Sequence, residues 1–103
     1  MKNIPAVARG TFKIIRVDGS EEIRAPVSLK AIYETIGCST LDAVILTRSA
    51  FAPEIVMLVD DTGMIDNKPI NQKATALYHG ICKPGTPYGI HGDVALVNDE
   101  DFA

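Results

Sequence analysis

Leu58-Val59-Asp60-Asp61-Thr62-Gly63, followed by Lys68-Pro69-Ile70-Asn71, is the stretch that decides the fold of this chain. An apolar run that ends in acidic residues and glycine is typical of a β-strand entering a turn. Pro69 disfavours helical backbone at Lys68, so the next helix is expected to begin at Asn71, whose side chain caps it. The residues predicted on the inward face of this helix are Ala74, Leu77, Tyr78 and Ile81.

Before this stretch, the sequence predicts a β-hairpin. Thr11 to Val17 alternates in polarity and is rich in β-forming residues, which favours a strand. Asp18-Gly19 then favours a tight type I′ turn, in which both residues take positive φ. Ser20 to Arg24 is expected to return as a short, charged strand at a sheet edge.

The remaining elements follow from caps and apolar runs. A helix is predicted between a Ser28 cap and a left-handed Gly37, with Leu29, Ile32, Tyr33 and Ile36 on one face. The other expected elements are strands over Leu41–Arg48, Glu54–Asp60 and Asp93–Asn98, a β return at Met64-Ile65, a helix stop at Gly80 and a loop over Lys83–Gly89.

This order, β-β-α-β-β-α-β, predicts an α+β fold. We expect a small mixed or antiparallel sheet with two short helices, mainly on one face. At 103 residues the chain is predicted to form a single domain over 1–103, with a loose N-terminus at 1–9 and a solvated acidic end at 99–103.

Composition narrows the functional classes. The net charge is −3, and the ten Lys and Arg residues are scattered, which argues against direct nucleic-acid binding. No apolar run is long enough to span a membrane. With two cysteines and no secretory-type leader, we expect a cytoplasmic protein (in the host cell, if phage-encoded) with reduced thiols.

Candidate catalytic and metal-binding residues are few. Cys82 could act as a nucleophile with His79 or His91, but no orienting third group or oxyanion site is evident, and a buried thiol is the commoner outcome. The same three residues lack the second ligand pair of a structural zinc site. Asp60-Asp61 with Asp66 is interpreted as turn chemistry rather than a cation site. We therefore assign no catalytic residue, metal or cofactor.

A binding surface is predicted beside the second helix. The loop Lys83–Gly89 carries Tyr88 between prolines and glycines, which would present it as a rigid aromatic anchor. Gln72, Lys73, Thr75 and His79 are expected to point outward next to this loop. The candidate binding residues are Lys73, Thr75, Tyr78, Lys83 and Tyr88, and the structural ones are Asp18, Gly19, Ser28, Gly37, Asn71 and Gly80.

The second half also resembles an uncharacterised domain family of short bacteriophage, plasmid and related bacterial proteins. The matching residues are Leu58 to Gly63, Pro69 and Asn71, Ala74 to Tyr78, Gly92-Asp93-Val94 and Asn98 to Phe102. The likeness covers about half of the chain well, and the first half by element order only. It implies a mobile-element accessory protein and brings no catalytic residues with it. Ile65 to Lys68 departs from the Leu/Gly-rich pattern of that family.

Three functional hypotheses follow. The leading one is a non-enzymatic accessory protein that modulates the host or counters a defence system by stoichiometric binding to a host protein. The second is a homo-oligomeric sink that sequesters a small nucleotide signal between subunits. The third is a small Cys/His enzyme that uses Cys82.

Overall fold

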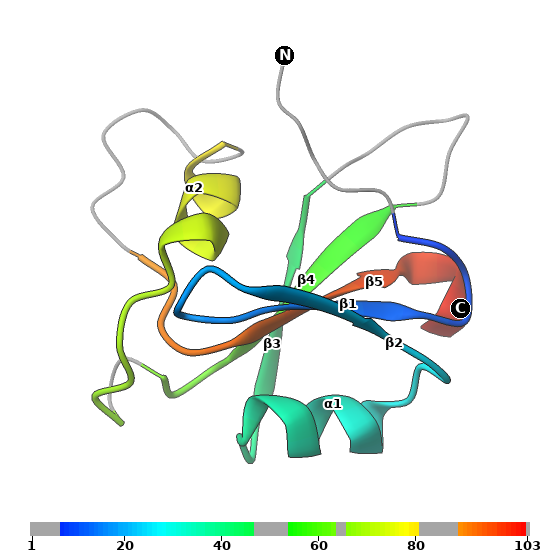
Figure 1. Ribbon diagram of the computed structural model, residues 1–103, viewed down its shortest axis with the longest axis horizontal. Helices are drawn as coiled ribbons and strands as arrows, with labels where there is room; N and C mark the ends of the chain where they lie inside the picture. Colours follow the sequence, from blue (N-terminus) through cyan, green and yellow to red (C-terminus); the bar gives the residue numbers. More distant parts are fainter. Residues whose placement is uncertain (1–6, 47–53, 64–65, 81–88, 103) are drawn as a thin grey trace.

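The computed structural model describes residues 7–46, 54–63, 66–80 and 89–102. It confirms the α+β class and the expected element order (Figure 1). No helix in these ranges combines the length and the hydropathy that a membrane crossing needs. The elements in chain order are β1 (Phe12–Ile15), β2 (Glu21–Arg24), α1 (Leu29–Ile36), β3 (Leu41–Ile45), β4 (Ile55–Asp60), α2 (Gln72–His79), β5 (Val94–Asn98) and the 3₁₀ helix η1 (Asp99–Phe102).

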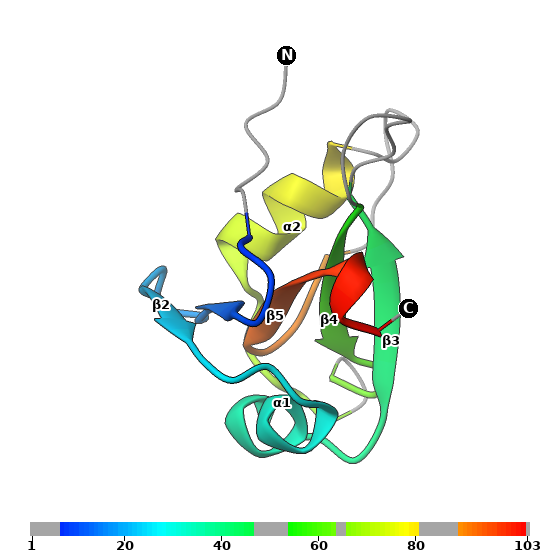
Figure 2. The ribbon, with the colours of Figure 1, turned by 90° about the vertical axis from the view of Figure 1, so that its right-hand side faces the viewer.

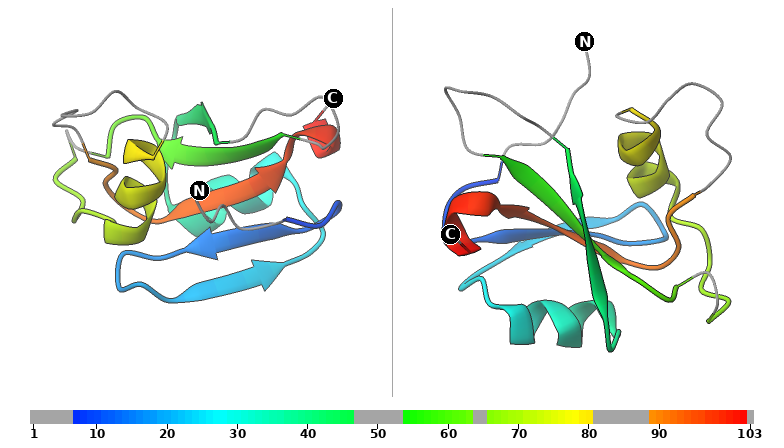
Figure 3. Two further views of the ribbon diagram at one scale, coloured as in Figure 1. Left: turned by 90° about the horizontal axis from the view of Figure 1, so that it is seen from above. Right: turned by 180° about the vertical axis from the view of Figure 1, so that it is seen from behind.

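The five strands form one antiparallel sheet in the order β2-β1-β5-β4-β3. Figure 2 shows β2 and β3 at opposite edges of the sheet. The last strand in sequence, β5, lies in the middle, where Val97 pairs with Phe12 on one side and Val56 on the other. Every residue of β4 and β5 is buried, as their uninterrupted apolar runs predict. The sheet is strongly twisted in all views (Figure 3).

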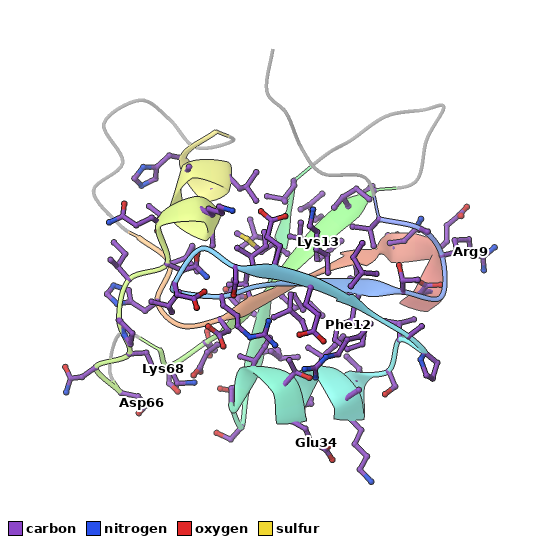
Figure 4. The ribbon with its side chains drawn as sticks, viewed as in Figure 1. Arg9, Phe12, Lys13, Glu34, Asp66 and Lys68 are labelled. Carbon is purple, nitrogen blue, oxygen red and sulfur yellow. The ribbon has the colours of Figure 1, made fainter. Side chains whose placement is uncertain are left out.

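The two helices lie on opposite faces of the sheet, which corrects the expectation that they cover mainly one. Figure 4 shows the consequence for β1, where Lys13 lies on the α2 side and Phe12 on the α1 side. Each face has its own core: Ala74 of α2 packs with Met57 and Leu96, and Ile32 of α1 packs with Phe12 and Val56. Because β4 and β5 are apolar on both sides, both faces have to be covered.

The first hairpin is present, but its turn differs from the prediction. Gly19 has φ +89°, whereas Asp18 does not take positive φ. The Gly19 amide donates to the Arg16 carbonyl (2.9 Å), and the Arg16 amide donates to the Ser20 carbonyl (2.9 Å). This is a three-residue loop instead of a two-residue type I′ turn. The Asp18 carboxylate accepts the Ser20 amide (2.8 Å), which favours the longer loop.

The helix boundaries confirm the capping predictions. The Ser28 hydroxyl accepts the Ala31 amide (3.1 Å), and Gly37 ends α1 in the left-handed conformation. Gly80 ends α2, although with right-handed helical φ. One residue departs from the expected inward face of α1, because Leu29 is 49% exposed. Met64, Ile65 and Ile81 lie outside the described residues.

The ends of the described chain are packed together. Val7 is buried in the core on the α2 side, and its carbonyl accepts a hydrogen bond from the side-chain amide of Asn98 (3.3 Å). The Asp101 carboxylate accepts the Gly10 amide through both oxygens (3.0 and 3.1 Å). Val7 and Asp101 are therefore held by contacts within the chain, whereas Ala8, Arg9, Asp99 and Glu100 are exposed.

Asn71 connects three parts of the fold, which are α2, the end of β1 and the segment before β5. Its side chain is fully buried, and its oxygen accepts the Ala74 amide (3.0 Å), which caps α2 as predicted. Its amide nitrogen donates to the carbonyls of Ile15 at the end of β1 (2.9 Å) and of Gly92 before β5 (3.0 Å). Its backbone amide donates to the Ile90 carbonyl (2.8 Å). One side chain thereby joins α2 to two neighbouring strands.

Asn71→Ala should lower the free energy of unfolding by about 2–4 kcal/mol, because it removes the cap and leaves buried carbonyls without their donor. Asn71→Ser is the matched control, since serine keeps the cap acceptor but has no amide to donate. We expect the serine variant to recover about 1 kcal/mol of the loss, measured by urea unfolding. Full recovery by serine would mean that the bonds to Ile15 and Gly92 contribute little.

Candidate functional site

The α2 surface predicted from the sequence is only partly available for binding. The Lys73 ammonium lies 2.9 Å from the Glu21 carboxylate, which also pairs with Lys13 (2.8 Å). Lys13, and then Lys73, hold the pKa of Glu21 below its usual value. Since Lys73 is half exposed, this pairing is weak, yet it gives the ammonium a partner within the chain.

Two other predicted binding residues have structural contacts. The Thr75 hydroxyl accepts the Ile90 amide (2.9 Å), so its polar group faces the segment before β5 rather than solvent. Tyr78 packs against the core on the α2 side, and its ring lies 6.0 Å from that of His79. Lys83 and Tyr88 lie outside the described residues, so the recognition loop stays a prediction.

The predicted cysteine and histidine chemistry is likewise only partly described. Cys82 lies outside the described residues. His91 pairs through Nδ1 with the Lys68 carbonyl (2.8 Å), and His79 is exposed near the end of α2. Within the described ranges, no three His, Cys, Asp or Glu residues are grouped closely enough to hold a metal ion.

A buried ion pair joins Asp60, the last residue of β4, to Lys68, near the end of α1. The Asp60 side chain is 1% exposed, and the Lys68 ammonium lies 2.5 Å from its Oδ2. The approach is not aligned for a hydrogen bond to Oδ2, so this contact is a charge pair. Lys68 also donates to the Gly37 carbonyl (3.0 Å), which links β4 to the end of α1 (Figure 4 places Lys68 near Asp66).

The electrostatics of this cluster favour structure over reactivity. Burial alone would raise the pKa of Asp60, but the Lys68 ammonium and the Thr62 amide and hydroxyl outweigh it and lower that pKa. Burial, reinforced by the Asp60 carboxylate, raises the pKa of the Cys38 thiol. This disfavours the thiolate form of Cys38, which is the nucleophilic form.

The strand β3 is an edge of the sheet, and no strand in the described ranges lies on its outer side. The Leu46 amide donates to the Ile55 carbonyl, and the Asp61 amide donates to the Thr40 carbonyl. Because bonded and non-bonded pairs alternate along antiparallel strands, these two bonds determine which residues of β3 direct their backbone groups toward β4. Asp42 and Val44 therefore direct their backbone groups toward β4. The backbone groups of Leu41, Ala43 and Ile45 point the other way, and among the described residues no strand pairs with them.

The opposite edge, β2, is protected by charge. Its Glu22 carboxylate pairs with Arg16 (2.8 Å) and Arg24 (2.6 Å), and Glu21 binds the two lysines described above. Charged side chains of this kind discourage a further strand from pairing. In contrast, β3 has the sequence Leu-Asp-Ala-Val-Ile, with Asp42 as its one charged residue.

An apolar groove of about 260 Å³ lies on the α1 face next to β3. Its floor is formed by buried side chains of the central strands, and half-exposed Leu29 stands at its rim. Ala43 contributes only a methyl group where a larger side chain would fill the space. The lining residues are Leu29, Ala43, Val56, Leu58, Val97 and Asp99.

This groove and the edge position of β3 were not predicted from the sequence. The helical spacing of Leu29 predicted burial, and the groove is the reason that it is not covered. The sequence of β3 is a short apolar strand with one small residue and one charge, which is a pattern that an edge strand can have. Which strand lies at an edge is determined by the strand order, and the sequence pattern does not give that order. No family model, curated protein or solved structure matches the chain, so the resemblance to phage accessory proteins stays a prediction.

Lys68→Met should destabilise the fold by about 2–3 kcal/mol at pH 7, because it leaves the Asp60 carboxylate buried without its cation. The lowered pKa of Asp60 in the native protein means that this pair stabilises above pH 4 and is lost as the pH falls further. The difference between the native protein and the variant in urea unfolding should therefore shrink as the pH falls below the ordinary pKa of an aspartate. Lys30→Met, on the exposed side of α1, is the control. A difference that is unchanged by pH would contradict a role for the charge pair.

Proposed function

We propose that this protein is a non-enzymatic accessory protein of a phage or other mobile element, which binds a host protein in fixed stoichiometry. Such binding would modulate the host or counter a defence system. The observation that carries the proposal is the open β3 edge beside the apolar groove, because unpaired strand edges and exposed apolar grooves are common sites of protein recognition.

Other features of the surface are consistent with a binding protein. Leu29, at the rim of the groove, is a large apolar residue that is 49% exposed. The groove itself is small, which suits one or two side chains of a partner better than a large cofactor. The link to mobile elements is associational, since it rests on the resemblance of the second half of the chain.

The two alternatives have less support among the described residues. A nucleotide sink would use Lys73 and Thr75, whose polar groups contact Glu21 and Ile90. A Cys/His enzyme would use Cys82, about which the described residues say nothing. A thermal-shift assay with a panel of nucleotides tests the nucleotide-sink alternative, because a bound ligand at one hundred times its Kd adds about 2.7 kcal/mol of stability.

The binding proposal is tested by capture from a bacterial host lysate at about 0.15 M salt, where weak surface charge contacts are largely screened. We expect one host protein to be enriched and to co-elute with this chain in a constant ratio on size exclusion. Ile23→Thr is the control bait, because it removes the most exposed apolar side chain from the protected β2 edge. Repeated recovery of the bait alone from the correct host would count against the proposal.

A further inference from the structure

We propose that β3 is the docking edge for an extended segment of another protein, in which apolar and basic side chains alternate. This inference rests on the proposed function, because it names the chemistry of the partner and the surface that it uses. The segment would add a sixth strand to the sheet beside Leu41–Ile45 and place one apolar side chain in the groove.

The backbone of β3 offers a strand-pairing register. Leu41, Ala43 and Ile45 direct their amides and carbonyls away from β4, as the ladder parity requires. Among the described residues, the hydrogen bond found on this side is local, because the Asp42 carboxylate accepts the Ala43 amide (2.9 Å). A carbonyl of an incoming strand can replace this contact without disturbing any bond between β3 and β4.

The groove determines which side chain the partner needs. Side chains that face each other across antiparallel strands lie on the same side of the sheet. A residue opposite Ala43 would therefore place its side chain on the α1 face, where the groove begins. The apolar floor and the volume of about 260 Å³ fit an aliphatic side chain such as leucine or methionine.

Charge favours a basic partner over a second copy of this chain. Asp42 is exposed on the other face of β3, and the exposed Asp99 lies at the groove. A lysine or arginine next to the apolar anchor would face Asp42 and release its carboxylate from the Ala43 amide. A second copy would instead bring two further carboxylates to the same edge, without a cation from either β3 strand.

The test uses a labelled, capped peptide, Lys-Val-Lys-Leu-Lys-Val-Lys, and a twin in which glutamate replaces every lysine. Fluorescence anisotropy should show saturable binding of the lysine peptide and at least about tenfold weaker binding of the glutamate twin. Ala43→Pro should weaken binding about tenfold or more, because it removes an outward amide while leaving every amide that points toward β4. Ile23→Pro is the matched control on the β2 edge, where Ile23 also points outward, and should change the Kd less than about twofold.

A second variant guards against a folding defect in Ala43→Pro. Ala43→Leu should fill the groove from within, keep the outward amide and still weaken binding, with an unchanged melting cooperativity. In the native protein, the peptide should also slow hydrogen exchange at the amides of Ala43 and Ile45, but not at Ile23. These results together would support β3 as the docking edge.

Four outcomes would overturn the inference: equal binding of the two peptides, no binding of either, an equal loss from Ile23→Pro, or a dimer of the native protein that Ala43→Pro converts to a monomer. The last outcome would assign the edge to self-pairing.

If Ala43→Pro still captures the host protein recovered by the native chain, the proposed function stands and the β3 inference fails. If the native chain captures nothing while the peptide result holds, the host-binding function fails and the edge assignment stands.

Discussion

The buried amide of Asn71 is the interaction on which the rest of this structure depends. One side chain caps α2 and bonds to β1 and to the segment that enters β5. A buried amide with satisfied partners has few alternative geometries, since any shift leaves a polar group unpaired. The position of α2 over the sheet, and with it the closure of one core, follows from this arrangement.

The core on the α1 face of the sheet is held by a different interaction, and part of that face stays exposed. There, Lys68 links the carbonyl at the end of α1 to Asp60 at the end of β4. This fixes the C-terminal end of α1, whereas Leu29 at its first turn stays half exposed beside the groove. The groove thus lies beside the outer edge of β3, which no strand of the described ranges pairs with, at the part of the sheet that α1 leaves uncovered. The proposed binding role rests on this proximity.

The features predictable from the sequence were those set by local chemistry. Ser28, Gly37 and Asn71 act on residues within one helical turn, so their capping roles could be derived, and the alternating or apolar runs placed all five strands. The side of the sheet that each helix covers depends on contacts across the chain. The same is true of the bonds from Asn71 to Ile15 and Gly92 and of the edge position of β3. Spacing alone therefore could not predict them. The prediction of a two-residue type I′ turn at Asp18-Gly19 was wrong, because the same dipeptide also occurs in three-residue loops.

Hydrogen exchange at the side-chain amide of Asn71 measures directly whether this amide holds α2 and the strands together, because it needs no substitution. By NMR, its two Nδ2 protons should exchange only when the whole domain unfolds, with the same opening free energy as the backbone amide of Leu96 in the middle of the sheet. The exposed side-chain amides of Asn67 and Gln72 should exchange rapidly in the same sample. If the Asn71 protons exchange as fast as those two, the amide does not hold α2 and the strands together, and the account is contradicted.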